Sequence, residues 1–164
     1  KTNIQKEIKK ATLSFSVSEG NSIERLFELC QKDFDRKNAK LLFDAEFASN
    51  LYTSFEASKE LFILEARDEN DDIIAAICLA NDTHYSHYIL GAVEFDSRNK
   101  GVMSLLLWEA IKLAKTNNLT FNFEGSMHEN ISRFFASFGG DLTPYFQITK
   151  ANHSVLKHIS KFQY

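Results

Sequence analysis

The feature that most constrains the fold of this chain is an almost wholly apolar segment at residues 73–80. A β-strand with one wet face alternates apolar and polar residues, whereas a strand covered on both faces is apolar along its length. The segment therefore predicts a central strand with a covering layer on each side. Polar turns at residues 67–72 and 81–83 flank it. These turns predict neighbouring antiparallel strands at residues 61–66 and 85–93.

Helical and strand patterns surround this three-stranded meander. Apolar residues at helical spacing predict a helix from about residue 23, and a second helix, capped by Asp44, carries Phe47, Leu51 and Phe55 on one side. The other expected elements are a helix ending near Thr12, a strand at 13–17, a long helix at 101–115, a strand at 119–123, a helix at 128–138, a strand at 142–148 and a short helix at 155–159. The order predicts one α/β (α+β) domain over residues 1–164. Its sheet is mixed and mostly antiparallel, with one right-handed parallel crossover.

Composition narrows the class of partner. The chain has 164 residues, 44% of them hydrophobic, which suits one globular domain with its own core. Its 19 basic and 22 acidic residues give a net charge of -3, which argues against a general polyanion binder. Four lysines among the first ten residues are the only basic cluster. They indicate a solvated helix face rather than an RNA contact, so a tRNA partner is not favoured.

Cysteine usage and hydropathy indicate the compartment. Cys30 and Cys78 stand in apolar contexts, which predicts buried thiols in a reducing, cytoplasmic compartment. No apolar run is long enough to span a bilayer. The chain begins with Lys1 inside a helical pattern and not with Met, so we expect it to be a piece of a longer polypeptide.

The turn before the long helix is a candidate anion site. It consists of Arg98, Asn99, Lys100, Gly101 and Val102. The first N–H groups of a helix have no partner within the helix, and together with the helix dipole they attract phosphate groups. The turn is therefore a candidate contact for an anion such as a phosphate group. An ordinary solvated helix entry explains the same residues and stays open.

A second candidate site lies where the strand at 119–123 ends. Glu124 at this mouth suits a general base for an amine, and a carboxylate paired with Arg133 is the alternative. Ser126 suits a hydrogen bond to an acyl oxygen. The favoured alternative is a helix cap near residue 127, with Glu129 completing a capping box.

Tyrosines and histidines add further candidates. Tyr145 and Tyr88 are candidate acids, and core phenols are the alternative. His84 and His87 are three apart on a strand and so point to opposite faces. No histidine pair has metal-ligand spacing with a third partner, so no metal site is expected.

Three segments carry a resemblance to a known family. They are the helix at residues 1–11, the helix at residues 101–114, and the passage Phe-Asn-Phe-Glu-Gly-Ser at residues 121–126 with the Arg-Phe-Phe and Phe-Gly-Gly that follow it. Together with the order of elements, they resemble the FemAB-like branch of the GNAT superfamily, including domains known as BioF2-like. The GNAT pyrophosphate turn has Gln or Arg, two residues, Gly, one residue, then Gly or Ala. Arg98 and Gly101 match it, and Met103 departs from it.

The resemblance implies the GNAT fold and transfer of an acetyl or aminoacyl group to an amine. The implied donor is acetyl-CoA or another acyl-CoA held by residues 98–102, or aminoacyl-tRNA, which the Fem enzymes use. The implied acceptor is a small-molecule or peptide amine, and the transfer is direct. Glu124 would be the base, with Tyr145 or Ser126 near the reacting carbonyl. Such proteins are bacterial and contain two GNAT-like halves, of which this chain would be the second. A non-catalytic half that supports its partner domain is the alternative.

Overall fold

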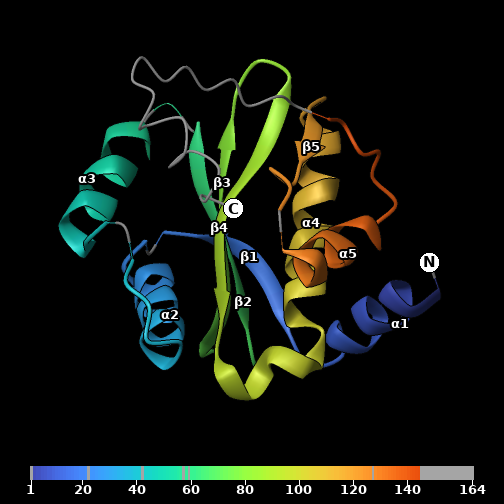
Figure 1. The fold of residues 1–164 in the computed structure, drawn as a ribbon, viewed down its shortest axis with the longest axis horizontal. Helices are drawn as coiled ribbons and strands as arrows, with labels where there is room; N and C mark the ends of the chain where they lie inside the picture. The colour runs from blue at the N-terminus through green and yellow to red at the C-terminus, as the bar shows by residue number, and fades with distance from the viewer. Residues whose placement is uncertain are drawn as a thin grey trace, which may run out of the picture.

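The computed structural model describes residues 2–144 apart from residues 22, 42, 57, 59 and 127 (Figure 1). Within this part of the chain a five-stranded sheet has the order β1-β2-β3-β4-β5. Its strands are β1 (Ser16–Gly20), β2 (Leu61–Arg67), β3 (Ile73–Asn81), β4 (Tyr85–Val93) and β5 (Thr120–Asn122). The first four strands are antiparallel, and β4 and β5 are parallel. The predicted mixed, mostly antiparallel sheet is confirmed.

Helices cover both faces of the sheet (Figure 1). They are α1 (Thr2–Ala11), α2 (Ile23–Arg36), α3 (Ala45–Glu56), the 3-10 helix η1 (Phe95–Lys100), α4 (Val102–Thr116) and α5 (Glu129–Ala136). Helices α2 and α3 pack on one face, whereas α4 and α5 pack on the other. Helix α1 lies beside the end of α4 that follows η1. None of the helices in the described ranges is long and apolar enough to cross a membrane.

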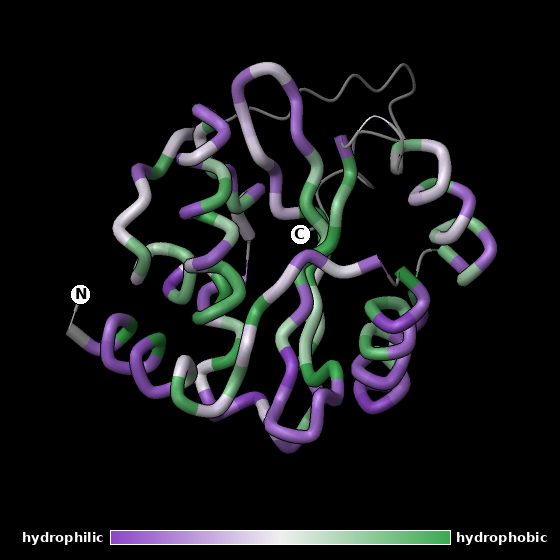
Figure 2. The backbone as a smooth tube through the Cα atoms, turned by 180° about the vertical axis from the view of Figure 1, so that it is seen from behind, coloured by the Kyte–Doolittle hydropathy of each residue, from purple (hydrophilic) through white to green (hydrophobic). Residues whose placement is uncertain are grey.

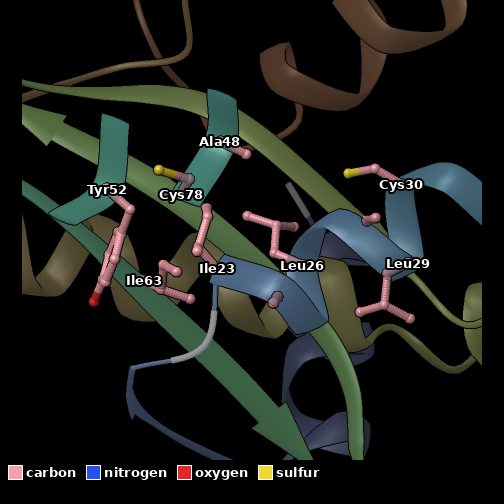
Figure 3. Packing of buried hydrophobic residues seen from close by; sticks show 10 residues of the cluster. Ile23, Leu26, Leu29, Cys30, Ala48, Tyr52, Ile63 and Cys78 are labelled. Carbon is pink, nitrogen blue, oxygen red and sulfur yellow. The ribbon is translucent and has the colours of Figure 1, made fainter. Parts of the chain in front are cut away.

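Strand β3 divides the core into two layers. Ala76 and Cys78 face α2 and α3, and Figure 3 shows the side chains of that layer. Ile77 and Leu79, both fully buried, face α4. Full burial of an Ile or Leu side chain stabilises a fold by about 1.5–3 kcal/mol. The predicted strand with two covered faces is therefore confirmed, and it forms the centre of the molecule.

The first strand starts later than predicted. Residues 13–17 alternate like a strand, but residues 12–14 complete the last turn of α1, where Ser14 N and Phe15 N donate to the carbonyl of Ala11. Strand β1 therefore begins at Ser16 and continues to Gly20. Gly20 leaves room for the Glu65 side chain, because a Cβ atom there would lie 2.2 Å from the Glu65 carboxyl group.

Two other predictions need correction or lie outside the structure. Asp44 does cap α3, since its Oδ1 accepts from Phe47 N at 2.8 Å, but the helix buries Ala48 and Tyr52 and leaves the predicted apolar side exposed. Residues 142–144 are irregular and not strand. The rest of the predicted strand at 142–148 and the helix at 155–159 lie outside the described residues.

Candidate functional site

The site forms where β5 ends beside the start of β4. Strand β5 pairs only with the first three residues of β4, so that Asn122 lies opposite His87. Glu124 then follows two residues beyond the strand, at the edge of the sheet. The register places Asn122 beside His87, and the chain turns at Glu124 and Gly125, so that the Glu124 carboxylate lies next to the His87 ring.

Glu124 is held in an unusual backbone conformation. Its φ is 60°, and Gly125 follows with a φ of 71°. A non-glycine residue in this left-handed region costs on the order of 1–3 kcal/mol, and such residues cluster at functional sites. Asn122 fixes it: its Oδ1 accepts from Glu124 N at 2.9 Å, and its Nδ2 donates to Glu124 Oε1 at 2.7 Å. The carboxylate is therefore oriented before any substrate arrives.

His87 connects Glu124 to a second carboxylate. Its Nδ1 lies 2.5 Å from Glu124 Oε1, and its Nε2 lies 3.1 Å from Asp82 Oδ2. Asp82 is fixed by the turn between β3 and β4, because its Oδ1 accepts from the backbone N–H groups of His84 and Tyr85 at 2.6 Å each. We call Asp82, His87 and Glu124 the proton row. The side chains of His87 and Glu124 are 25% and 49% exposed, so an acceptor can reach them.

The charges of the proton row favour a protonated imidazole. The hydrogen bond that the His87 ring donates to Asp82, followed by the one that it donates to Glu124, raises the pKa of His87 above its usual 6.5. The backbone N–H of His84 and the His87 ring lower the pKa of Asp82 to about 2. When His87 is neutral, Nε2–H still donates to Asp82, and Nδ1 lies 3.3 Å from the Asn122 amide that donates to it. The 2.5 Å contact between Nδ1 and Glu124 Oε1 needs a proton between the two atoms, so the geometry is that of the protonated imidazole, and Nδ1 is the atom whose proton is lost when His87 becomes neutral.

Two predicted alternatives at this site need correction. Glu124 does pair with a neighbouring basic side chain, but that side chain is His87, and Arg133 pairs with Glu129 one turn earlier in α5. The capping box does not form either, because α5 begins at Glu129 and the residue before it, His128, has no side-chain cap bond. Ser126 Oγ instead accepts from His128 N at 3.1 Å. Ser126 thus closes a turn before the helix rather than capping it.

The structure decides the role of one of the two candidate tyrosines. Tyr88 points to the opposite face from His87, where its ring meets Phe135 edge-on at 5.9 Å. Burial raises its pKa to about 12, which makes it a core phenol. Tyr145 lies outside the described residues. No three His, Cys, Asp or Glu side chains are grouped to hold a metal ion in the part of the chain that the structure describes.

Sequence reasoning missed Asp82, His87 and Asn122. Asp82 and His87 are five residues apart across a hairpin turn, a separation at which the turn brings the two side chains together. Asn122 stands two residues before Glu124, a spacing typical of an Asn side chain that bonds nearby backbone. The link from His87 to Glu124 had no local signal, because it depends on the register of β5 on β4.

The predicted anion turn at residues 98–102 has its own partners. Arg98 pairs with Asp33 on α2 and lies over the Phe95 ring at 5.3 Å. Gly101 adopts a φ of 76°, and a Cβ atom there would lie 3.0 Å from the backbone oxygen of Glu7. Ser104 Oγ donates to Glu7 Oε2 at 3.2 Å. Helix α1 therefore lies against the amino end of α4.

Together these features define a class of protein. A meander of antiparallel strands leads through a 3-10 turn and a long helix to a parallel strand that pairs only briefly, with a carboxylate at its end. This is the architecture of N-acyltransferases. The chain belongs to the acetyltransferase (GNAT) domain family, whose model matches residues 1–128. Members of this family transfer an acyl group from acetyl-CoA to an amine.

Solved structures share the fold at low identity. A predicted acetyltransferase with acetyl-CoA from Clostridium acetobutylicum has a TM-score of 0.65 and 15% identity, covering 85% of this chain and 99% of that one. An aminoglycoside 6'-N-acetyltransferase from Acinetobacter baumannii has a TM-score of 0.62 and 13% identity, with the same coverage of both chains. FemX has a TM-score of 0.69 and 10% identity, and the match covers 80% of this chain and 52% of FemX. This chain therefore spans about half of FemX. Comparison with curated proteins gives no match.

Two residues, Glu7 and Arg98, oppose a pyrophosphate of coenzyme A at the amino end of α4 as this structure presents it. A grip on pyrophosphate needs N–H donors and a cation facing the helix end. Here the backbone oxygen and carboxylate of Glu7 face it, and both are acceptors. Arg98 is turned toward α2.

Proposed function

We propose that this domain is an N-acyltransferase in which Glu124 is the general base for the acceptor amine. The observation that carries the proposal is the proton row, in which Glu124 is fixed by Asn122 and linked to His87 Nδ1 at 2.5 Å. The amine nitrogen attacks the acyl carbonyl carbon, a C–N bond forms, and the bond to the leaving group breaks. The proton that the nitrogen loses passes to Glu124 and is shared with His87 Nδ1, while Asp82 holds Nε2–H.

Two further residues complete the proposed site. Ser126 lies two residues beyond Glu124, and its hydroxyl, which accepts from His128 N, retains a proton to donate to the acyl oxygen. Tyr145 stays a prediction as the acid for the leaving group. The two cysteines are excluded as nucleophiles, because burial raises the pKa of Cys30 and of Cys78 to about 12.

The finer family placement is also a proposal. The shared fold with FemX, of which this chain spans 52%, supports a FemAB-like half of a two-domain, cytoplasmic bacterial protein. Under that placement an upstream GNAT-like half is the partner domain, and the acceptor is a small-molecule or peptide amine. Aminoacyl-tRNA is the donor to compare with acyl-CoA.

Acyl transfer to a panel of primary amines tests the proposal, with acetyl-CoA and aminoacyl-tRNA as alternative donors. We expect amide product from the wild type and a rate lower by about 10²–10⁴-fold for Glu124→Gln, the contribution of a positioned base. Glu129→Gln is the matched control, because Glu129 pairs with Arg133 at the surface. A Glu124→Gln variant as active as the control would remove Glu124 as the base.

One observation favours the alternative of a non-catalytic half that supports its partner domain. Glu7 lies at the amino end of α4, where its carboxylate disfavours the binding of the coenzyme A pyrophosphate. If the wild type forms no amide from either donor while the two-domain protein does, this half serves a supporting role.

A further inference from the structure

Helix α1 is anchored firmly over the amino end of α4. Ile4 and Ala11, one near each end of α1, are 8% and 0% exposed. Between them the backbone oxygen of Glu7 approaches Gly101 so closely that a Cβ atom there would lie at 3.0 Å. Figure 1 shows α1 beside the end of α4 that follows η1. The space beside the Gly101 Cα atom is therefore closed by the backbone of α1.

The chemistry of that contact repels phosphate. Ser104, itself 2% exposed, donates its hydroxyl to Glu7 Oε2 at 3.2 Å. The carboxylate thus places a negative charge near the positive end of the α4 dipole, where a carboxylate is stabilised as a phosphate would be. Phosphate oxygens accept hydrogen bonds, and the two Glu7 oxygens have none to donate.

Arg98 of the predicted anion turn is held by an ion pair with α2. Arg98 pairs with Asp33, whose side chain is 19% exposed. Burial works against the charge of Asp33, but hydrogen bonds from Lys37, Arg36 and Arg98 hold the pKa of its carboxyl well below its usual range. A phosphate would have to compete with this ionised carboxylate for the guanidinium.

We propose that Glu7 is a specificity-determining residue that selects against a pyrophosphate at the amino end of α4. The acyl donor is then bound through its acyl group and the chain that links this group to the pyrophosphate. The inference deepens the proposed function by restricting how the donor is held. It concerns donor binding alone. The role of Glu7 can therefore be disproved while Glu124 is still the base, and the role of Glu124 can be disproved while Glu7 still acts on donor binding.

Calorimetric binding of coenzyme A and of pantetheine, which lacks the pyrophosphate and nucleotide, tests this proposal. We expect the wild type to bind coenzyme A no more than about threefold tighter than pantetheine. Glu7→Gln removes the charge and adds an N–H donor at nearly constant shape. We expect it to bind coenzyme A about three- to tenfold tighter than the wild type, with pantetheine unchanged.

Two controls sharpen the result. Glu7→Asp keeps the charge, and Glu46→Gln removes an exposed charge on α3; neither should gain affinity for coenzyme A. Tenfold tighter binding of coenzyme A than of pantetheine by the wild type would overturn the proposal even if Glu7→Gln fails to fold. So would a folded Glu7→Gln variant with unchanged affinity for coenzyme A. If the wild type binds neither molecule, the affinity of Glu7→Gln for coenzyme A is decisive. Measurable binding by this variant supports the proposal, and no binding contradicts it.

Discussion

At the scale of single residues, His87 shows how neighbours set chemistry. Its ring lies between Asp82 and Glu124, and with both nitrogens protonated each nitrogen donates to a carboxylate. These anions raise the pKa of His87. The raised pKa favours the protonated form at neutral pH, so the row is ready to accept a proton only above that pKa. The same residues thus provide a base and a limit on the pH at which it works.

Asp82→Asn should lower the pKa of His87, because it removes the largest stabiliser of the imidazolium. The titration of the His87 ring, followed by NMR in the wild type and the variant, measures the change. Asp71→Asn is a control that removes an exposed carboxylate at the other hairpin turn. An unchanged His87 titration in Asp82→Asn would show that the bond to Nε2 does not form in solution.

The same pKa predicts a pH dependence of stability. A group whose pKa is raised on folding stabilises the protein fully below its unfolded value, near 6.5, and loses that effect as pH rises through the folded value. The difference in unfolding free energy between wild type and His87→Gln should therefore be larger at pH 5.5 than at pH 9. The effect is modest because His87 is partly exposed and solvent screens its charge. Urea unfolding at the two pH values measures it, and a larger difference at pH 9 would contradict it.

At the scale of elements, the sequence predicts strands well where burial is complete. The apolar residues on both faces of β3 predict this strand. The alternation at residues 13–17 predicts a start for β1 that is three residues too early, because this pattern does not register the turn that ends α1. Leu13, counted as strand, is 85% exposed. Helix α3 shows the same limit: Phe47, Leu51 and Phe55 share a side, yet they are 56%, 43% and 40% exposed. A local pattern reports which residues share a face but not which face packs on the sheet.

The central role of β3 gives a stability prediction. Ile77→Ala should lower the unfolding free energy by about 2–5 kcal/mol, because Ile77 is fully buried between β3 and α4 and its loss leaves a cavity. Ile89→Ala makes the same substitution on β4 at a side chain that is 53% exposed, and it should cost much less. Urea unfolding of both variants measures the difference. Equal losses would mean that β3 is not the centre of the core.

At the scale of the whole molecule, two ends of one sheet have different roles. The proton row lies where β5 ends beside β4, and α1 covers the amino end of α4. Glu124 is predictable because it directly follows a strand pattern and stands before a glycine. The row around it and the contact of Glu7 with Ser104 were not, since they join residues 37 and 97 positions apart. Such contacts follow from topology and register, which no local pattern contains. Figure 2 shows that α1 is largely hydrophilic, and it packs through a face on which Ile4 and Ala11 are buried.

The pH dependence of amide formation by the wild type and by His87→Gln tests the central claim, that the proton row accepts the proton of the acceptor amine. The wild-type rate should rise with pH along an acid limb whose apparent pKa lies above 6.5, as His87 loses its proton. In His87→Gln that limb should move or disappear, and the rate at high pH should fall at least about tenfold as Glu124 loses its partner. The same rate and the same acid limb in both proteins would contradict the claim.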